Sequence, residues 1–346
     1  MLQLPPTALS EEIMNAESVG IVRRDVTVVI PAYTFDRWEL TCLAISSVLK
    51  QTVLPGELLL CVDHNRTLFE QFQEYVGQLT VSTPMVRVIE SKYEGHQAAS
   101  RTTGVECATG DYIVFLDDDA SADPTWLEMM VRGLSQPDVI AVGGAPLPVY
   151  SAARPSWFPF EFDWIFGCAY AGLPTTAEPV LHLIGTTIAA RREDLLAIGG
   201  FQFDVFEDLV MCHQLLQLSP NSTLLYEPAA IVRHYVHENR LTWSYFWRRV
   251  FWVNRTKVSV MRSLGDAANL TAERRFVGRA LLRGTARGVL EFFRGDRSGL
   301  LRSGATVFGV GLAGIGYLVG LVEPRSIGAS ADALRQHSGL SDRMGN

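Results

Sequence analysis

The segment Tyr112-Ile113-Val114-Phe115-Leu116-Asp117-Asp118-Asp119 joins an apolar run to a cluster of acids. Its first five residues, mostly β-branched or aromatic, predict a buried strand, and the three carboxylates follow where that strand ends. Two carboxylates about 4 Å apart repel by about 4 kcal/mol at an effective dielectric of about 20, so we expect a cation among them. Oxygen ligands with no cysteine nearby favour Mg²⁺ or Mn²⁺. The alternative is a solvated acidic turn at the end of the sheet.

Apolar runs and helical spacings alternate on both sides of this segment. Strands are predicted over Val26–Ile30, Glu57–Val62, Val86–Ile89, Tyr112–Leu116, Ile140–Val142, Leu183–Ala190 and Ala229–Val232. Helices are predicted over Trp38–Lys50, Leu68–Leu79, Gly95–Thr109, Arg192–Ile198 and Phe206–Leu218. A further helix, capped by Asp123 and begun by Pro124, is predicted to run to Leu134. The alternation predicts an α/β fold with a mostly parallel central sheet flanked by helices on both faces.

The composition limits the classes of partner. The chain has 346 residues and a net charge of −7, which argues against a nucleic-acid-binding surface. The charge is uneven, because Thr271–Arg302 holds eight arginines against three acids. The five cysteines are widely spaced and odd in number, which predicts free thiols in a reducing compartment.

The sequence predicts five segments along the chain. They are a flexible leader over 1–25 without the pattern of a signal peptide, an α/β domain over 26–240, a basic helical extension over 241–302, an apolar segment over 303–322 and a tail over 323–346. Inside the α/β domain, the aromatic and proline-rich stretch Ala153–Pro174 is predicted to be a long ordered loop over the sheet edge. It serves either to fill the core or to face the substrate.

The apolar segment Ser303–Val322 is long enough to cross a membrane. Six of its twenty residues are glycine, and Gly316 and Gly320 form a small-x-x-x-small pattern suited to close helix contact. Basic residues precede it, which predicts that the domain before it is cytoplasmic. Ala280–Phe293 has the pattern of a basic amphipathic helix at a membrane interface. A buried core helix or a re-entrant segment is the alternative, since glycine lowers helix propensity.

Short motifs over about residues 26–260 resemble glycosyltransferase family 2. The motifs are Val28-Val29-Ile30-Pro31-Ala32-Tyr33, Val62-Asp63-His64-Asn65, Ala99-Ser100-Arg101 with Gly104, Asp117-Asp118-Asp119, Gly199-Gly200-Phe201 and Glu207-Asp208. Val62-Asp63-His64-Asn65 and the stretches Trp157-Phe158-Pro159, Glu161-Phe162-Asp163-Trp164 and Gly167-Cys168 look like the prokaryotic subgroup that includes glucosyl-dolichyl phosphate glucuronosyltransferase. The resemblance implies the GT-A fold and a nucleotide-sugar donor, with UDP as the expected nucleotide. It also implies that the domain over 26–240 is the nucleotide-sugar-binding and catalytic domain.

The resemblance implies roles for the donor-binding and metal-binding residues. Asp119 is the expected direct ligand of Mg²⁺ or Mn²⁺, and His234, which follows a predicted strand, matches a position that supplies a further ligand in some relatives. The remaining candidates would bind the donor: Asp117 or Asp118 at the ribose or at the metal through water, Pro31, Tyr33 and Asp63 at the uracil and ribose, and Arg101 at the nucleotide or its phosphates. Each of these residues also has an ordinary structural explanation, such as ending a strand, packing or capping a turn.

The acceptor hydroxyl must lose a proton as it attacks the sugar, which requires a base within hydrogen-bond reach. By resemblance this base is Asp208, with Glu207 beside it. An acidic pair that stabilises a helix N-terminus is the alternative. A direct displacement with one base inverts the anomeric configuration, an outcome that the family implies.

Five positions depart from the family pattern and bear on donor and acceptor. They are His64, Thr102, Gln202, Val210 and Gln214. The leading hypothesis is an inverting, metal-dependent glycosyltransferase at the cytoplasmic face of the membrane, peripheral or single-span, which transfers a sugar to a lipid-linked or polysaccharide acceptor. The alternatives are a polyprenyl-phosphate glycosyl synthase and an inactive sugar-nucleotide-binding scaffold in envelope assembly.

Overall fold

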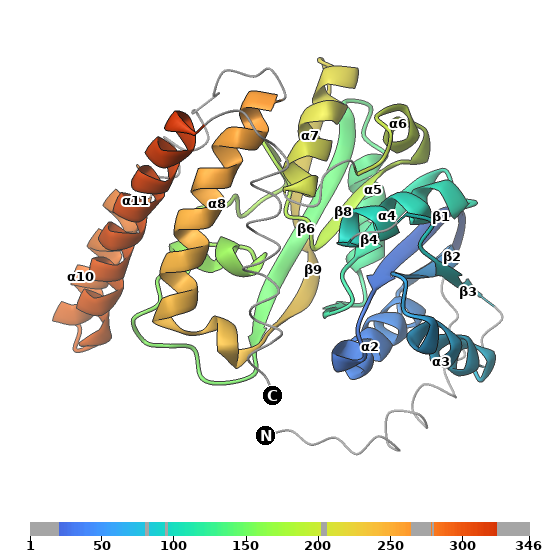
Figure 1. Cartoon of the computed structure of the whole chain (residues 1–346), viewed down its shortest axis with the longest axis horizontal. Helices are drawn as coiled ribbons and strands as arrows, with labels where there is room; N and C mark the ends of the chain where they lie inside the picture. The colour runs from blue at the N-terminus through green and yellow to red at the C-terminus, as the bar shows by residue number, and fades with distance from the viewer. Residues whose placement is uncertain are drawn as a thin grey trace. The chain divides into compact units, whose positions relative to one another are not determined.

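The computed structural model describes residues 21–79, 83–93, 96–201, 206–263, 278 and 280–323 (Figure 1). The tail after residue 323 and the first twenty residues of the predicted leader lie outside this range. Residues 21–25, predicted to belong to the leader, form the start of the first strand. The described chain divides into two compact units, one built from residues 21–147 and 174–234 and the other from 148–173 and 235–323.

The first unit alternates strands and helices along most of its length. Its strands are β1 (Ile21–Ala32), β2 (Val53–Val62), β3 (Met85–Glu90), β4 (Tyr112–Leu116), β5 (Ala120–Ala122), β6 (Val139–Tyr150), β7 (Glu178–Val180), β8 (Thr187–Arg191) and β9 (Thr223–Val236). Its helices are η1 (Phe35–Arg37), α2 (Trp38–Leu49), α3 (Arg66–Gly77), α4 (His96–Cys107), α5 (Trp126–Leu134), α6 (Arg192–Ala197) and α7 (Glu207–Leu218). β6 and β9 continue into the second unit. The predicted α/β class is confirmed.

The sheet has the strand order β3-β2-β1-β4-β8-β6-β9-β5, with β7 paired to β9. The strands β3, β2, β1 and β4 are parallel to one another, as predicted. Beyond β4 the sheet is mixed, because β4 with β8, β6 with β8, β5 with β9 and β7 with β9 are antiparallel pairs. The carboxyl ends of β1, β2 and β4 therefore meet at one edge, where ligands bind in open α/β sheets.

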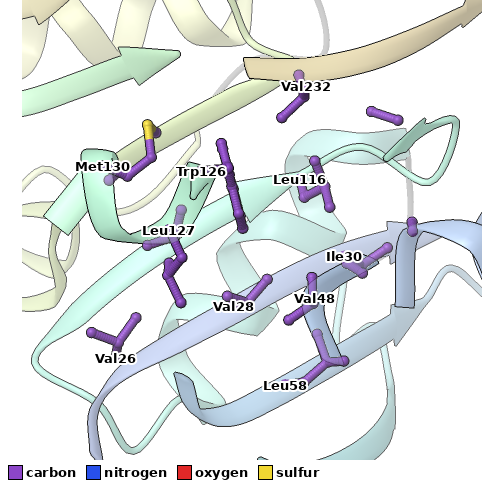
Figure 2. Packing of buried hydrophobic residues seen from close by; sticks show 14 of the residues in the cluster. Val26, Val28, Ile30, Val48, Leu58, Leu116, Trp126, Leu127, Met130 and Val232 are labelled. Carbon is purple, nitrogen blue, oxygen red and sulfur yellow. The ribbon is translucent and has the colours of Figure 1, made fainter. Parts of the chain in front are cut away.

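Alternate residues of the central strands face two separate hydrophobic layers. Val28 of β1 and Leu116 of β4 pack with α2, α3 and α5 in one layer, whereas Val29 and Phe115 pack with α4, α6 and α7 in the other. This period of two explains why the strands read as continuous apolar runs, since both faces are covered. Figure 2 shows the first layer, with Trp126 of α5 lying among residues of β1, β4 and β9.

Two predicted helix boundaries can be compared with the structure. Gly199 and Gly200 have positive φ, and their N–H groups donate to Leu196 and Leu195, so these glycines cap the end of the helix predicted over Arg192–Ile198. The predicted start at Asp123 and Pro124 is wrong, because α5 begins at Trp126. Asp123 instead forms an ion pair with Arg233 of β9 at 2.9 Å, so its carboxylate is not available as a cap.

Two other boundaries differ in the middle of the chain. The strand predicted over Leu183–Ala190 begins only at Thr187 as β8, and Ile140–Val142 is the start of the much longer β6. In Ala153–Pro174, predicted to be a loop, Phe160–Phe166 forms the helix η2 of the second unit. Phe158, Phe162 and Phe166 of this stretch are buried against one another, as the core-filling interpretation predicts, while a role facing the substrate stays a prediction.

The second unit is helical and aromatic. Besides η2 it contains η3 (Glu238–Arg240), α8 (Trp243–Ser263), the π-helix η4 (Ala280–Gly284), α10 (Thr285–Phe293) and α11 (Ser298–Val322). Its core joins Phe158, Phe162 and Phe166 to Phe246 and Val250 of α8. Within this core Phe158 stacks on Phe166, with the ring centroids 4.9 Å apart. α11 contacts both α8 and α10 (Figure 1).

Candidate active site

The three acids after β4 are held by the backbone around them. The N–H of Asp117 donates to the carbonyl of Thr186 at 3.1 Å, and the carbonyl of Asp117 accepts from Ala120 at the start of β5. Asp118 and Asp119 are buried. This sharp turn at the end of a buried strand brings three carboxylates together at the edge that parallel α/β sheets use for ligands.

Asp117, Asp119 and His234 come together as a possible set of metal ligands. One ligand atom from each residue lies within 4.8 Å of the other two. The pairing of β5 with β9 explains this convergence, because Ala120 is opposite His234 in the register. Nε2 of His234 lies 3.1 Å from Oδ1 of Asp119. Two carboxylates and an imidazole suit a divalent first-row ion such as Mn²⁺, and the carboxylates suit Mg²⁺.

Arg37 supplies a cation that the sequence did not predict. Its Nη1 donates to Oδ1 of Asp118 at 2.7 Å and lies 3.1 Å from Oδ2 of Asp119. Its guanidinium also lies over the ring of Tyr33, 5.3 Å from the centroid. Arg37 therefore relieves part of the repulsion among the three carboxylates. For this reason the acidic cluster alone does not show that a metal binds.

The acids are difficult to ionise despite these cations. Burial raises the pKa of Asp118 to about 7, and Arg37 only partly opposes the effect. Burial likewise raises the pKa of Asp117, with Arg101 opposing it. Oδ2 of Asp118 is buried and has no hydrogen-bond partner within the described part of the chain. A buried carboxylate oxygen without a donor is an acceptor site for a ligand.

Arg101 is fully buried and joins the acids to the start of α7. Nη2 of Arg101 donates to Asp117 at 2.6 Å and to the carbonyl of Gly185 at 2.8 Å, while Nη1 donates to Glu207. Its guanidinium also lies over the ring of Phe201. The structure thus directs this arginine toward protein carboxylates, and its contact with the nucleotide or its phosphates, implied by the resemblance, stays a prediction.

Asp208 follows Glu207 in the first turn of α7 and is connected to the same network. The N–H of Gly185 donates to Oδ2 of Asp208 at 3.0 Å. Gly185 therefore contacts Arg101 through its carbonyl and Asp208 through its N–H, which places the predicted base beside the acid cluster. A Cβ at Gly185 would lie 3.1 Å from Oδ2 of Asp208, so the carboxylate would have to shift slightly to accommodate it.

The residues predicted to hold the nucleotide lie at the ends of β1 and β2. Pro31 is still within β1, opposite Cys61 of β2, and the half-exposed ring of Tyr33 follows. The N–H of Asp63 donates to Ala32 at 2.8 Å, which ties the two strand ends together. The structure therefore places these residues at the carboxyl edge of the sheet, where β4 also ends.

His64, one of the departures from the family pattern, contacts Asp63 directly. Its Nδ1 lies 2.8 Å from Oδ1 of Asp63, and its φ is +43°. Positive φ is uncommon for a residue with a side chain and is found at functional sites. The substitution at this position thus brings an imidazole to the predicted nucleotide end.

The other departures have visible structural roles or lie outside the described residues. The Oγ1 of Thr102 accepts from the N–H of Phe201 at 2.9 Å, so Thr102 fixes the Gly199-Gly200-Phe201 turn. Val210 is buried in α7, and Gln214 lies one turn further along the same helix. Gln202 is among the residues that the structure does not describe.

Three residues of the site were missed by the sequence analysis. Arg37 lies shortly after the first strand, close in sequence to the predicted nucleotide-binding residue Tyr33. That position was a signal by which it could have been identified. Gln97, whose Nε2 donates to Oδ1 of Asp117 at 2.5 Å, and Gly185 carry no local signal. Their roles depend on long-range packing of α4 and of the segment before β8.

Comparison with known proteins identifies the family of the chain. Residues 27–199 match the model of Glycosyl transferase family 2. The glucosyl-dolichyl phosphate glucuronosyltransferase of Haloferax volcanii is 31% identical over 242 residues, which cover 67% of this chain and 76% of that protein. The pre-mycofactocin glycosyltransferase of Mycobacterium tuberculosis is 26% identical, over 62% of this chain and 43% of that protein.

A solved structure that resembles the chain is the mannosyltransferase PcManGT of Pyrobaculum calidifontis in complex with GDP-Man and Mn²⁺. It has a TM-score of 0.47 and 15% identity, over 96% of this chain and 86% of that one. The match to the family covers the strands and acids described above, including β1, β4 and the triplet Asp117-Asp118-Asp119. The chain belongs to glycosyltransferase family 2 and is a glycosyltransferase that uses nucleotide sugars.

Proposed function

We propose that the chain is an inverting, metal-dependent glycosyltransferase that transfers a sugar from a UDP-sugar to a lipid-linked or polysaccharide acceptor. The observation that carries this proposal is the connected network of the acid cluster and α7. Asp117 is joined through Arg101 to Glu207, and Gly185 joins Arg101 to Asp208. Such a network holds a donor-binding end and a basic carboxylate in one rigid arrangement, as transfer between two substrates requires.

The proposed donor site is the carboxyl edge of the parallel strands. Tyr33 and Asp63 would contact the nucleoside, and the open acceptor oxygen of Asp118 would receive a ribose hydroxyl. Asp117, Asp119 and His234 would hold Mg²⁺ or Mn²⁺. Bound there, the ion would neutralise the leaving diphosphate as a Lewis acid.

Asp208 is proposed as the general base. The acceptor oxygen attacks the anomeric carbon, the bond from that carbon to the diphosphate oxygen breaks, and its electron pair leaves with the diphosphate. The proton of the acceptor hydroxyl passes to the Asp208 carboxylate, which Gly185 orients at 3.0 Å. One displacement from the side opposite the leaving group inverts the anomeric configuration.

The lipid-linked acceptor is proposed on two grounds. A relative that matches over 67% of this chain is named for a dolichyl phosphate-linked glucose acceptor. In addition, α11 is long and apolar enough to enter a membrane by its length and composition. The cytoplasmic face is proposed because its anionic lipids attract the basic residues that precede this helix.

A transfer assay with purified full-length protein tests the proposal. UDP-, GDP- and dTDP-sugars are supplied with a polyprenyl-linked glycan acceptor, with Mn²⁺, with Mg²⁺ or with EDTA. We expect transfer that depends on the metal and is lost in Asp119→Asn and Asp208→Asn. Full transfer in EDTA would overturn metal dependence, and nucleotide binding without turnover on any acceptor would indicate a scaffold. Retained activity in Asp208→Asn would indicate a phosphate acceptor, which needs no strong base.

A further inference from the structure

α11 has the reverse of the residue distribution expected for a helix on the surface of a soluble protein. Its fully buried residues are all small, namely Gly299, Ser303, Ala305, Thr306, Gly309, Gly316 and Gly320, while Val310 and Leu312 are partly buried against the core of the unit. Its exposed face carries large apolar ones, namely Leu300, Leu301, Val307, Phe308, Ile315, Leu318, Leu321 and Val322. A surface helix in water normally buries its large apolar side chains and exposes polar ones.

The exposed residues form one continuous row, which we call the apolar stripe of α11. At about 100° per residue, their positions fall within about half of the helix circumference, with the exposed Gly304, Gly311 and Gly314 between them, so they lie on one side of the helix. Leu318 is 62% exposed and Val322 is 83% exposed. The small face is already used within the second unit, because a side chain at Gly316 or Gly320 would lie 2.5 or 2.3 Å from a backbone oxygen of α8.

α10 and the preceding η4 add a second apolar row with arginines beside it. Leu282, Ala286, Leu290 and Phe293 are exposed at helical spacing. Arg283, Arg287 and Arg294 are exposed one position after three of them, and Arg297 follows at the turn to α11. This arrangement of apolar and cationic rows complements a surface that has acyl chains beneath anionic headgroups.

The neighbour of α11 argues against insertion as a span. α8 lies along α11 from the contact of Trp243 with Phe308 to the hydrogen bond from Arg262 to the carbonyl of Gly320. If α11 crossed a bilayer in this arrangement, α8 would have to cross with it. α8 carries Arg248, Arg249, Arg255, Lys257 and Arg262, and charged residues are costly at the centre of a bilayer.

We propose that α10 and α11 form an interfacial hairpin that rests on an anionic lipid bilayer, with the apolar stripe of α11 among the acyl chains and α8 at the headgroups. The exposed Trp243 and Trp247 of α8 suit that depth. The proposal rests on the proposed function only for the membrane location of the acceptor. Lipid binding is measured without donor or acceptor, so the two proposals can fail separately.

Co-sedimentation of the full chain with vesicles tests the hairpin. Vesicles of phosphatidylcholine alone are compared with vesicles that contain phosphatidylglycerol. We expect binding to the anionic vesicles that falls at least tenfold in the triple variant Phe308→Ser, Ile315→Ser and Leu318→Ser. The matched control replaces three exposed apolar residues of the first unit, Leu43→Ser, Met85→Ser and Leu196→Ser, and should bind as the wild type does.

A second variant tests the proposal independently if the stripe variant fails to fold. The variant Arg283→Gln, Arg294→Gln and Arg297→Gln should lose most of the preference for anionic vesicles, with little change on phosphatidylcholine. Equal binding by the wild type and the stripe variant would overturn the proposal. Self-association that is lost in the stripe variant, without vesicle binding, would overturn it in favour of a second copy of the chain.

Labelling distinguishes an interfacial hairpin from a span. A cysteine is placed at Arg297 or at Glu323, the two ends of α11, and the protein with its native cysteines alone gives the background. After the protein is added to preformed vesicles, a membrane-impermeant maleimide should label both positions. Protection of Glu323→Cys until detergent is added would show that α11 spans the bilayer and would overturn the proposal.

Discussion

Nε2 of His234 lies 3.1 Å from Oδ1 of Asp119, although the two residues belong to segments far apart in the sequence. The antiparallel pairing of β5 with β9 brings them together, with Ala120 opposite His234. An imidazole beside a buried carboxylate can be a structural pair or part of a ligand set. The nearby Asp117 favours the ligand set, because three such groups converge within 4.8 Å.

Replacement of His234 should therefore change the response to metal. We expect His234→Gln to raise the Mn²⁺ concentration needed for half-maximal transfer by about 10- to 100-fold, the usual cost of disturbing a metal site. Asp119→Asn should abolish transfer at every metal concentration tested. Metal titration of donor turnover measures both effects. His237→Gln, the same change at an exposed histidine three residues further on, is the control and should leave the titration unchanged.

Asp208→Asn should lower kcat by about 10²- to 10⁴-fold, the usual contribution of a general base. The amide oxygen can still accept from Gly185, so the fold and donor binding should be retained. Calorimetry with the nucleotide-sugar and single-turnover kinetics separate the two effects. Asp194→Asn on α6 provides the control, with an expected kcat within a factor of about two of wild type, since surface changes have small effects. A loss of donor affinity in Asp208→Asn would argue against a role as base.

Arg101→Met should destabilise the first unit by about 3–5 kcal/mol. The change leaves two mostly buried carboxylates, Asp117 and Glu207, without the buried cation that they share. Arg101→Lys should rescue little, because an ammonium cannot reproduce the planar fork that reaches both acids and Gly185. Chemical denaturation measures the loss. Arg233→Met, which removes a more exposed ion pair with Asp123, should cost about 1 kcal/mol or less. An equal cost for the two variants would contradict the proposed bridging role.

The sequence predicted the parallel half of the fold well because its signals there are local. Both faces of β1, β2 and β4 are covered, so each strand is a run of apolar residues followed by a polar residue at the edge where ligands bind. Tyr33, Asp63 and Asp117 could be identified for this reason. The network that joins the acids to α7 was not predictable, because Arg101, Gly185 and Asp208 meet only through the packing of α4, α7 and the segment before β8 on one face of the sheet.

The antiparallel half was harder to predict. β6 and β9 extend well beyond their apolar cores, into segments with proline and charged residues that weaken the strand pattern. The role of Arg37 was also hidden, because a single arginine in a turn is usually solvated. The structure alone shows that the guanidinium of Arg37 lies among buried acids at the end of β4.

The glycines of α11 allow a matched comparison within one helix. A side chain at Gly316 would lie 2.5 Å from the carbonyl oxygen of Phe251, whereas no atom lies within 4 Å of the corresponding position at Gly311. Gly316→Ala should therefore destabilise the second unit by about 1–3 kcal/mol through overpacking. Gly311→Ala should stabilise the helix by up to about 1 kcal/mol. Thermal unfolding in detergent measures both. If both changes stabilise the protein equally, the close contact of α8 with α11 is absent in solution.

Asp163 predicts a pH dependence in the second unit. Burial raises the pKa of this carboxyl to about 6, even though Arg154 lies 2.8 Å away. In the unfolded chain the pKa is near its usual value of about 4, so between these values the folded protein holds a proton that the unfolded chain has released. The stability from this group is thus fully present below about pH 4 and is lost as the pH rises through about 6.

Asp163→Asn removes this titration, so its effect can be read as a difference from the wild type. As the pH rises from 4 to 7, the wild type should lose up to about 3 kcal/mol relative to Asp163→Asn. Urea unfolding at several pH values measures the difference. Asp296→Asn gives a control of opposite sign, because a hydrogen bond from Arg302 lowers the pKa of that exposed carboxyl. Relative to Asp296→Asn, the wild type should lose stability as the pH falls. If the free energies of unfolding of the wild type and Asp163→Asn differ by the same amount at every pH, the Asp163 carboxyl has the same pKa in the folded and unfolded states. That result would show that Arg154 fully offsets the effect of burial on this pKa.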